Sequence, residues 1–430
     1  MRSHHLLLQL RPLKLNKEHV MKSKILFYLI LITFLTLFIP PVHAQTFSVL
    51  YAFTGRADGA APDAGVTIRG NALYGTTAGP ICGTVYQLTN AGSNWLFSTL
   101  AALPNNCDPW SRPVFGPDGH LYSTSEAGGT YGQGTVFKLT PPVGVCRTVA
   151  CYWTVSDLHD FSAGTDGQNP IYGDLIWDQQ GNMYGTTQFG GTSQNCNEGC
   201  GIVYELTPSG NGYTESVLYS FSGTPDGSWP FAGLVLDNKG NLFGTTFIGG
   251  PNDLGTIFEL SYVPGVGWTE HVLYAFKGTD DGGKPAGGVI FDSAGNLYGT
   301  TYEGGSGGGG TVFELSPSGD TWTFKLLYSF SVDSCGPAEA LTMDGAGNLY
   351  GTTWCGGIYN NGNVFKLSNT EDGWVYTSLH DFTGGADGGG HVLSNVSIDA
   401  DGTLYGTAQA GGDMNCNNGY GCGVVWMIKP

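Results

Sequence analysis

Five aspartates recur at equivalent places in this sequence, and carboxylates held in register are candidates for calcium binding. They lie in stretches such as FSGTPDGSWP and FKGTDDGGKP, and are Asp58, Asp166, Asp226, Asp281 and Asp387. Calcium needs its oxygen ligands within about 2.3–2.6 Å, whereas packed β-sheets lie about 10 Å apart. Asp-Gly is also a favourable turn pair. We therefore interpret the five aspartates as turn residues and expect neither a metal site nor a cofactor.

Aromatic residues that differ from loop to loop offer a second kind of chemistry. Exposed aromatic rings stack on sugar rings or apolar side chains, and neighbouring carboxylates accept hydrogen bonds from hydroxyls or amines. The predicted ligand-binding residues are Asp226, Trp229, Phe247, Asp281, Tyr302 and Trp354. The alternative is that these rings fill gaps between packed sheets, because aromatic residues are commonly buried.

Signs of catalysis are few. An active site requires a nucleophile beside a base, or two carboxylates held close together. The sequence has no H-E-x-x-H zinc motif and no P-loop, and His159 and His380 recur in the same LHDF context, which indicates packing. A binding or scaffold protein with a carbohydrate or peptide ligand is therefore the first hypothesis, and we predict no catalytic residue. The alternatives are an extracellular carbohydrate-active hydrolase or lyase, and a purely structural repeat protein.

A repeat of about 55 residues carries these loops. The stretch DSAGNLYGTT at 292–301 returns as DNKGNLFGTT, DGAGNLYGTT and DQQGNMYGTT, and in looser copies. Each unit contains a short apolar run, the GNLYGTT segment, a GTVFEL segment and an aromatic-rich run, each four to nine residues long. Their composition and their Gly, Asp or Pro boundaries are typical of β-strands. Seven such units predict an all-β, seven-bladed β-propeller with four antiparallel strands per blade.

The ends of the repeat region predict how the ring closes. The stretch QTFSVLYAF at 45–53 matches a fourth strand, and GVVWMIKP at 423–430 matches a third strand. We expect residues 47–53 to pair with residues 424–428, so that the N-terminal strand completes the last blade. The small residues of each Gly-Thr-Thr are expected to let neighbouring blades approach closely near the axis.

Residues 1–44 have the features of a leader. Lys22 and Lys24 precede an apolar run at 25–39, which two prolines and a short segment ending at Ala44 follow. The run is shorter than the roughly 20 residues of a membrane span, and the pattern is typical of a secretory signal peptide. We expect initiation at Met21, cleavage after Ala44, and a single propeller domain at 45–430.

The exported part is strongly acidic. The chain has 17 Lys and Arg and 35 Asp and Glu, of which the leader holds six basic residues and one acidic residue, so the exported part carries a net charge of −23. Such a surface repels nucleic acid and anionic lipid. We expect a secreted or periplasmic monomer that binds no nucleic acid and has no membrane span in its mature chain.

All ten cysteines lie after the leader, as expected for an oxidising compartment. They fall into close neighbours along the chain, and none has the C-x-x-C spacing of a redox or zinc motif. The predicted disulfides are Cys82–Cys107, Cys146–Cys151, Cys196–Cys200, Cys335–Cys355 and Cys416–Cys422.

The units resemble the GloVer repeats of bacterial exported choice-of-anchor proteins. The matching motifs are G-N-L-Y-G-T-T, G-T-V-F-E-L and L-Y-S-F-x-G-x-x-D-G-x-x-P, and they extend from about Phe47 to Lys429. The resemblance implies a tandem-repeat, propeller-like fold and no particular activity. Its anchor tails are variable, and no such tail follows the last strand here, so release or periplasmic residence is expected.

Overall fold

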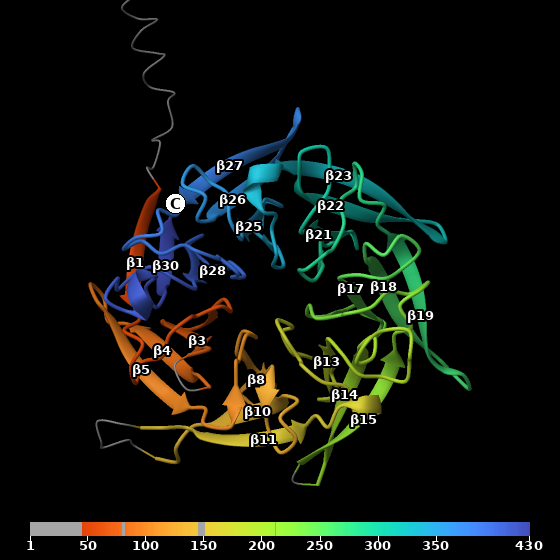
Figure 1. Ribbon diagram of the computed structural model, residues 1–430, viewed down its shortest axis with the longest axis horizontal. Coiled ribbons are helices and arrows are strands. Elements are labelled where there is room, and N and C mark those ends of the chain that lie inside the picture. The colour runs from red at the N-terminus through yellow and green to blue at the C-terminus, as the bar shows by residue number, and fades with distance from the viewer. Residues whose placement is uncertain (1–44, 80–81, 145–150, 211) are drawn as a thin grey trace, which may run out of the picture. The chain divides into compact units, whose positions relative to one another are not determined.

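The fold consists of seven antiparallel sheets arranged in a ring (Figure 1). The computed structural model describes residues 45–79, 82–144, 151–210 and 212–430, and Thr46–Lys429 form one compact unit. Each sheet has four strands, so the prediction of an all-β, seven-bladed propeller is confirmed. Within the described ranges there is no α-helix, only the 3-10 helices η1 (Gly164–Asp166), η2 (Val332–Ser334) and η3 (Asn417–Gly419).

The first four blades follow one another along the chain, each running from the axis to the rim. Blade 1 consists of β2 (Thr67–Arg69), β3 (Ala72–Thr77), β4 (Thr84–Asn90) and β5 (Trp95–Ala102). Blade 2 consists of β7 (Val114–Phe115), β8 (Leu121–Ser125), β10 (Thr135–Thr140) and β11 (Thr154–Asp160). Blade 3 consists of β12 (Ile176–Trp177), β13 (Met183–Thr187), β14 (Ile202–Ser209) and β15 (Gly212–Ser220). Blade 4 consists of β16 (Val235–Leu236), β17 (Leu242–Thr246), β18 (Thr256–Val263) and β19 (Gly267–Ala275).

The last three blades complete the ring. Blade 5 consists of β20 (Ile290–Phe291), β21 (Leu297–Thr301), β22 (Gly308–Ser318) and β23 (Thr321–Ser331). Blade 6 consists of β24 (Thr342–Met343), β25 (Leu349–Thr353), β26 (Asn363–Thr370) and β27 (Gly373–Asp381). Blade 7 consists of β28 (Ser397–Ile398), β29 (Leu404–Ala408), β30 (Val424–Lys429) and β1 (Thr46–Ala52). A further two-stranded sheet joins β6 (Asn106–Cys107) and β9 (Ala127–Gly128).

The N-terminal strand closes the ring. β1 pairs antiparallel with β30, from Thr46 opposite Lys429 to Ala52 opposite Val424. The predicted closure is thus confirmed, and the first and last strands share blade 7 in Figure 1. Closing the ring in this way leaves no unfinished blade whose edge could pair with another chain.

The innermost strands are shorter than predicted. They contain only two or three residues each, against the expected four to nine, and most of these residues are only partly buried. Each of them is the end strand of its sheet, and its free edge borders the axis. The second strands, such as β21, are the fully buried ones.

The repeated D-x-x-G-N-x-Y hairpin is held by its aspartate. In blade 5, Asp292 Oδ1 accepts hydrogen bonds from the Ala294 and Asn296 amides at 2.8 and 2.9 Å, and Oδ2 accepts from Tyr298 Oη at 3.2 Å. A carboxylate that binds its own turn in this way fixes the hairpin between the first and second strands.

The Gly-Thr-Thr segment joins strands and blades. In blade 5, Thr301 Oγ1 lies 2.8 Å from Thr311 Oγ1 of the third strand. Thr300 Oγ1 donates to the Glu339 carbonyl of blade 6 at 3.2 Å. The glycine has a different role from the predicted one, because a Cβ on Gly299 would lie 2.6 Å from Phe313 Cζ of the same blade. The glycine therefore makes room for a third-strand aromatic, and the threonine contacts the next blade.

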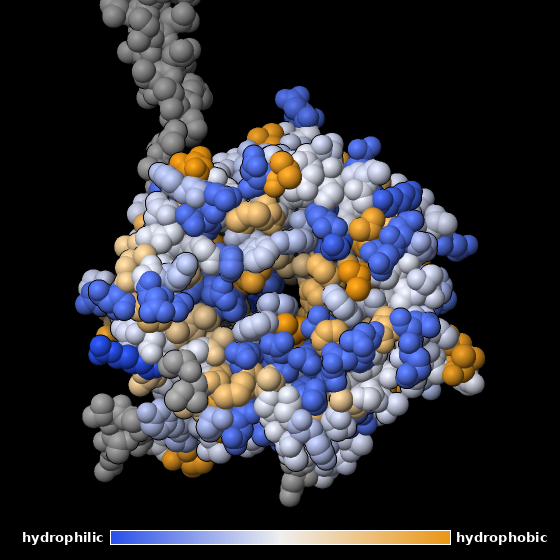
Figure 2. Space-filling model, viewed as in Figure 1, coloured by the Kyte–Doolittle hydropathy of each residue, from blue (hydrophilic) through white to orange (hydrophobic). Residues whose placement is uncertain are grey.

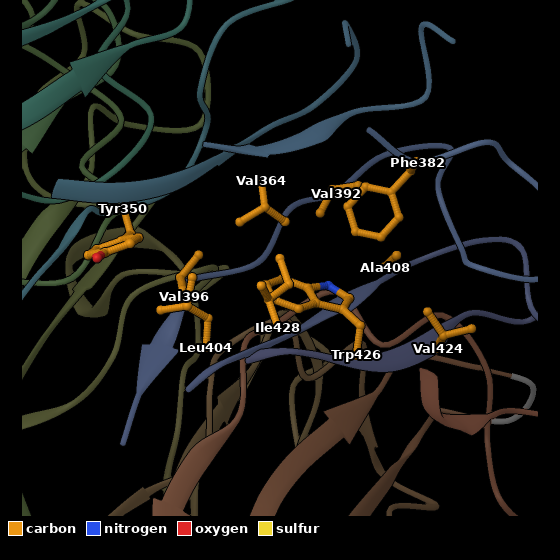
Figure 3. Packing of buried hydrophobic residues seen from close by; sticks show 10 residues of the cluster. All are labelled: Tyr350, Val364, Phe382, Val392, Val396, Leu404, Ala408, Val424, Trp426 and Ile428. Atoms are coloured by element: carbon orange, nitrogen blue, oxygen red, sulfur yellow. The ribbon is translucent and has the colours of Figure 1, made fainter. Parts of the chain in front are cut away.

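Hydrophobic clusters fill the spaces between blades. Figure 3 shows the cluster between blades 6 and 7, where Tyr350 and Val364 of blade 6 face Trp426 and Ile428 of blade 7. Trp426 is fully buried, and its Nε1 donates to the Thr407 carbonyl at 3.0 Å. Burying aromatic side chains between sheets supplies much of the stabilisation of such a ring.

Four disulfides lie in the described part of the chain, two of them between separate segments and two within single loops. They are Cys82–Cys107, Cys196–Cys200, Cys335–Cys355 and Cys416–Cys422. The predicted Cys146–Cys151 pair cannot be compared, since Cys146 lies outside the described residues. Such disulfides are consistent with an extracellular or periplasmic protein. In the described ranges, no helix has the length and apolar character needed to cross a bilayer.

Candidate functional site

The recurring loop aspartates lock their own turns. Asp226 Oδ2 accepts hydrogen bonds from Tyr219 Oη at 2.7 Å and from the Ser222 amide at 3.1 Å. Asp281 Oδ2 accepts from Tyr274 Oη at 2.8 Å and from the Lys277 amide at 3.0 Å. Both aspartates are buried, and neither lines any of the three cavities described below. Their positions support the interpretation that they are turn residues over the prediction that they contact a ligand.

Three of the predicted aromatic residues do come together on the loop face. Phe247, Tyr302 and Trp354 line one cavity of about 170 Å³, which Tyr172 and Phe231 complete. We call these five side chains the aromatic crescent. Its rings form two contacting groups, with centroids 5.9 Å apart for Tyr172 and Phe231, 4.9 Å for Phe231 and Phe247, and 5.6 Å for Tyr302 and Trp354.

Trp229 lies outside the crescent. Its ring packs edge-on against Phe189 at 5.6 Å, and it lines a separate cavity beside Cys196 and Asp253. Its backbone has a positive φ of 60°, and its amide donates to the Cys200 carbonyl at 2.9 Å. The structure therefore brings Phe247, Tyr302 and Trp354 together and separates Trp229 from them.

A third cavity occupies the axis of the ring, where Figure 2 shows the molecule hollowed at its centre. It measures about 220 Å³ and is bordered by the inner strands of blades 3 to 6. Its polar side chains include Arg112, Asp174, Glu339 and Asn395. Glu339 and Tyr172 also line the crescent cavity, so the two cavities share these walls.

Arg112 ties three blades together inside this axial cavity. Its Nε donates to Asp174 Oδ2 at 3.0 Å, and its Nη2 forms a still shorter contact with the same oxygen. Its Nη1 donates to Ser397 Oγ of blade 7 at 3.3 Å. Arg112 carries the only guanidinium among the described residues of the cavity wall, and it is already paired with one carboxylate and one hydroxyl.

Glu339 has an unusual electrostatic environment. Burial raises the pKa of its carboxyl well above the ordinary value, and the charges of Asp174 and Asp63 raise it further, while Arg112 opposes the shift. Burial likewise raises the pKa of Asp63 to about 7, against a hydrogen bond from Gln409 Nε2 at 3.1 Å that lowers it. Carboxyls with raised pKa values in a cavity are typical of functional sites.

The axial residues occupy fixed positions relative to each inner strand. The residues two positions before that strand are, in successive blades, Gly65, Arg112, Asp174, Gly233, Gly288, Ala340 and Asn395. One position earlier lie Ala64, Ser111, Gly173, Ala232, Gly287, Glu339 and Ser394. Most members of both sets are small, so the charged exceptions mark the site. Sequence reasoning missed Arg112, Asp174 and Glu339, although aligning the units on the inner strand would have exposed them.

Comparisons with known proteins agree with this architecture. The sequence profile of the Gloeobacter/Verrucomicrobia repeat matches residues 79–266 and 189–421. No curated protein matches the chain.

Solved structures resemble the chain in fold alone. A protein of Bacteroides uniformis, provisionally assigned as a 6-phosphogluconolactonase, is 17% identical with a TM-score of 0.51, over 78% of this chain and 88% of its own. A gluconolactonase of Xanthomonas campestris is 12% identical with a TM-score of 0.43, over 91% of this chain and 98% of its own.

Proposed function

The chain belongs to the Gloeobacter/Verrucomicrobia repeat family, and from that premise we propose that it is an exported binding protein that captures a carbohydrate or a peptide on the loop face of the propeller. The observation that carries this proposal is the aromatic crescent. Five aromatic side chains from four successive blades line one apolar cavity, with Glu339 in its wall. Apolar walls with a few polar groups are the common form of a small-ligand site.

The crescent suits a flat or saturated ligand surface. Tyr302 and Trp354 are only partly buried, and their rings lie 5.6 Å apart, tilted by 44°. Trp354 Nε1 is buried and has no hydrogen-bond partner within the described residues, so the partly exposed ring supplies the contact surface. Stacking on these aromatic rings would orient a sugar ring or a side chain.

A glycan and peptide array tests the proposal. The exported protein should capture ligand, and Trp354→Ala should weaken capture at least tenfold, which corresponds to about 1.4 kcal/mol. Trp229→Ala is the matched control, because this tryptophan lies outside the crescent and should leave capture unchanged. Equal capture by the wild type and Trp354→Ala, with both proteins folded, would contradict the proposed site.

An extracellular carbohydrate-active enzyme is the alternative function. It is favoured by the Glu339 carboxyl, whose pKa burial and the neighbouring Asp174 and Asp63 charges raise, because a carboxyl that stays protonated can act as a general acid. Release of reducing ends or unsaturated sugars from polysaccharide, abolished by Glu339→Gln, would favour this alternative over binding alone.

A further inference from the structure

The axial cavity is rich in hydrogen-bond acceptors that have no donor. Asp174 Oδ1 and Asn395 Oδ1, on residues that line the cavity, are buried and have no hydrogen-bond partner within the described residues. Asp63 is only 4% exposed, and its Oδ1 is equally without a partner. Buried polar atoms are normally hydrogen-bonded, and leaving one unpaired is costly. All three of these atoms are carbonyl or carboxylate oxygens, so the missing partner is a donor.

The same region is short of positive charge. Asp63, Asp174 and Glu339 are close enough for their charges to interact, and Arg112 is the one cation among the described residues that line the two cavities. Its guanidinium is already engaged by Asp174 and Ser397. Like charges held together out of water favour the binding of a cation.

The geometry favours an organic cation over a metal ion. Among the described residues, no three His, Cys, Asp or Glu side chains are grouped closely enough to hold a metal. An ammonium group has three N–H donors and reaches acceptors at ordinary hydrogen-bond distance. Of the crescent, Tyr172 lines both cavities, and aromatic faces attract ammonium groups.

We propose that the axial cavity binds the protonated primary amine of an amino sugar, with Glu339, Asp174 and Asn395 as its acceptors and the aromatic crescent against the sugar ring. This inference rests on the proposed binding function and specifies its ligand. The cavities of about 170 and 220 Å³ are of the size of a single sugar ring with its amine. A saturated ring bearing hydroxyls and one cation matches both an apolar aromatic wall and an acceptor-rich axis.

Binding of the amine should change the protonation of Glu339. Asp63, Asp174, Arg112 and Tyr172 are the ionisable groups that interact with Glu339. In the empty site, burial and the charges of Asp174 and Asp63 raise the pKa of the Glu339 carboxyl and so favour its protonated form. An arriving –NH₃⁺ group stabilises the carboxylate, so Glu339 gives up its proton to the buffer. Binding of a neutral sugar has no such effect.

Calorimetry with a glucosamine disaccharide and its N-acetylated counterpart tests the inference. At about pH 6 the amine is charged, and the exported protein should bind the amino disaccharide at least tenfold more tightly than the acetylated one. Titrations in two buffers of different ionisation enthalpy should show release of close to one proton. Equal affinity for the two sugars, or binding of the amino sugar without proton release, would overturn the inference.

Variants separate this inference from the proposed function. Glu339→Gln preserves the shape of the protonated side chain, so it should remain folded, lose the preference for the amino sugar and release no proton. Glu198→Gln, on an exposed loop residue, is the matched control and should change neither quantity. Capture of neutral glycans that Trp354→Ala abolishes, together with equal affinity of the wild type for the amino and the acetylated disaccharide, would keep the proposed function and overturn the amine site. Binding of a lysine peptide but not of the amino disaccharide would also overturn it.

Discussion

The ring of Phe47 lies parallel to the imidazole of His380, with the two centroids 3.6 Å apart and the planes inclined by 5°. Phe47 belongs to β1, which completes blade 7, and His380 belongs to the outer strand of blade 6. Two kinds of contact therefore hold β1, the strand that closes the ring. It is hydrogen-bonded to β30 in its own blade and packed against the preceding blade.

Replacing Phe47 tests this second attachment. Phe47 is partly buried and also contacts Phe382 and Trp426, so Phe47→Ala should lower the free energy of unfolding by about 2–3 kcal/mol, somewhat less than for a fully buried phenylalanine. Val49→Ala on the same strand is the control, because Val49 is 37% exposed and should cost less than about 1 kcal/mol. Urea titration of both variants measures the difference. Equal losses would mean that β1 is held by its backbone pairing alone.

Replacing the glycine of the Gly-Thr-Thr segment should destabilise the protein more than replacing a glycine of the D-x-x-G-N hairpin. A Cβ on Gly351 would lie 2.7 Å from Phe365 Cζ and 3.1 Å from Leu341 Cδ2, whereas a Cβ on Gly345 meets nothing within 4 Å. Gly351→Ala should therefore destabilise blade 6 by about 1–3 kcal/mol through overpacking. Gly345→Ala should change stability by less than about 0.5 kcal/mol. Thermal melts of the pair provide the comparison, and similar melting temperatures would contradict the packing role.

Mass spectrometry can identify the first residue of the mature chain and the pairing of its cysteines. We expect the exported protein to begin at Gln45, because the segment before it has the features of a signal peptide. Peptide mapping without reduction should find Cys146 joined to Cys151, the pair that completes the even set of ten cysteines. A mature chain that starts elsewhere, or a free thiol at Cys146, would refute the corresponding prediction.

The architecture was predictable because every repeat contains the same strand and turn motifs. The motif around Leu297 recurs with its turn residues intact, and the unmatched strands at the two ends predicted the pairing of Thr46 with Lys429. The lengths of the inner strands were not predictable. An apolar run such as GVIFD has the composition of a longer strand, but only Ile290 and Phe291 of this run pair with the second strand.

The site was predictable only in part. Phe247, Tyr302 and Trp354 share one position after the second strand, so the ring symmetry brings them to one face. Trp229 lies on the loop that enters blade 4 and not at this position after a second strand, and its ring packs against Phe189 instead. Glu339 carried no motif, because its importance comes from carboxyls on other blades that converge only when the ring is closed.

Stability should depend on pH through acids buried between blades. Glu215 and Glu270 stand opposite Leu206 and Leu260, where the neighbouring blade 5 places Phe324 opposite its equivalent leucine. Burial, with the charge of Asp166, raises the pKa of Glu215 to about 7. Burial, with the charge of Asp226, raises the pKa of Glu270 to about 8.

Because these pKa values exceed the ordinary value of 4.5, the folded protein holds protons that the unfolded chain has already lost. The stability that they contribute is present below about pH 4.5 and is lost as the pH rises through 7 and 8. The hairpin carboxyls act in the opposite sense. Burial alone would raise the pKa of Asp292, but hydrogen bonds from Asn296 and Ala294 outweigh it and lower that pKa, so their contribution is lost as the pH falls below the ordinary value of 3.8.

The melting temperature should therefore be highest at about pH 4–6 and fall by several degrees towards pH 9. Glu270→Gln should flatten the alkaline side of this profile, because a neutral amide has no proton to lose, and should raise the melting temperature above pH 8. Glu371→Gln, on the exposed β26–β27 hairpin, is the control and should leave the profile unchanged. Scanning calorimetry across the pH range measures all three proteins. A wild-type profile that rises steadily from pH 5 to pH 9, or a Glu270→Gln profile that superimposes on the wild type, would show that the buried glutamates do not govern the alkaline loss of stability.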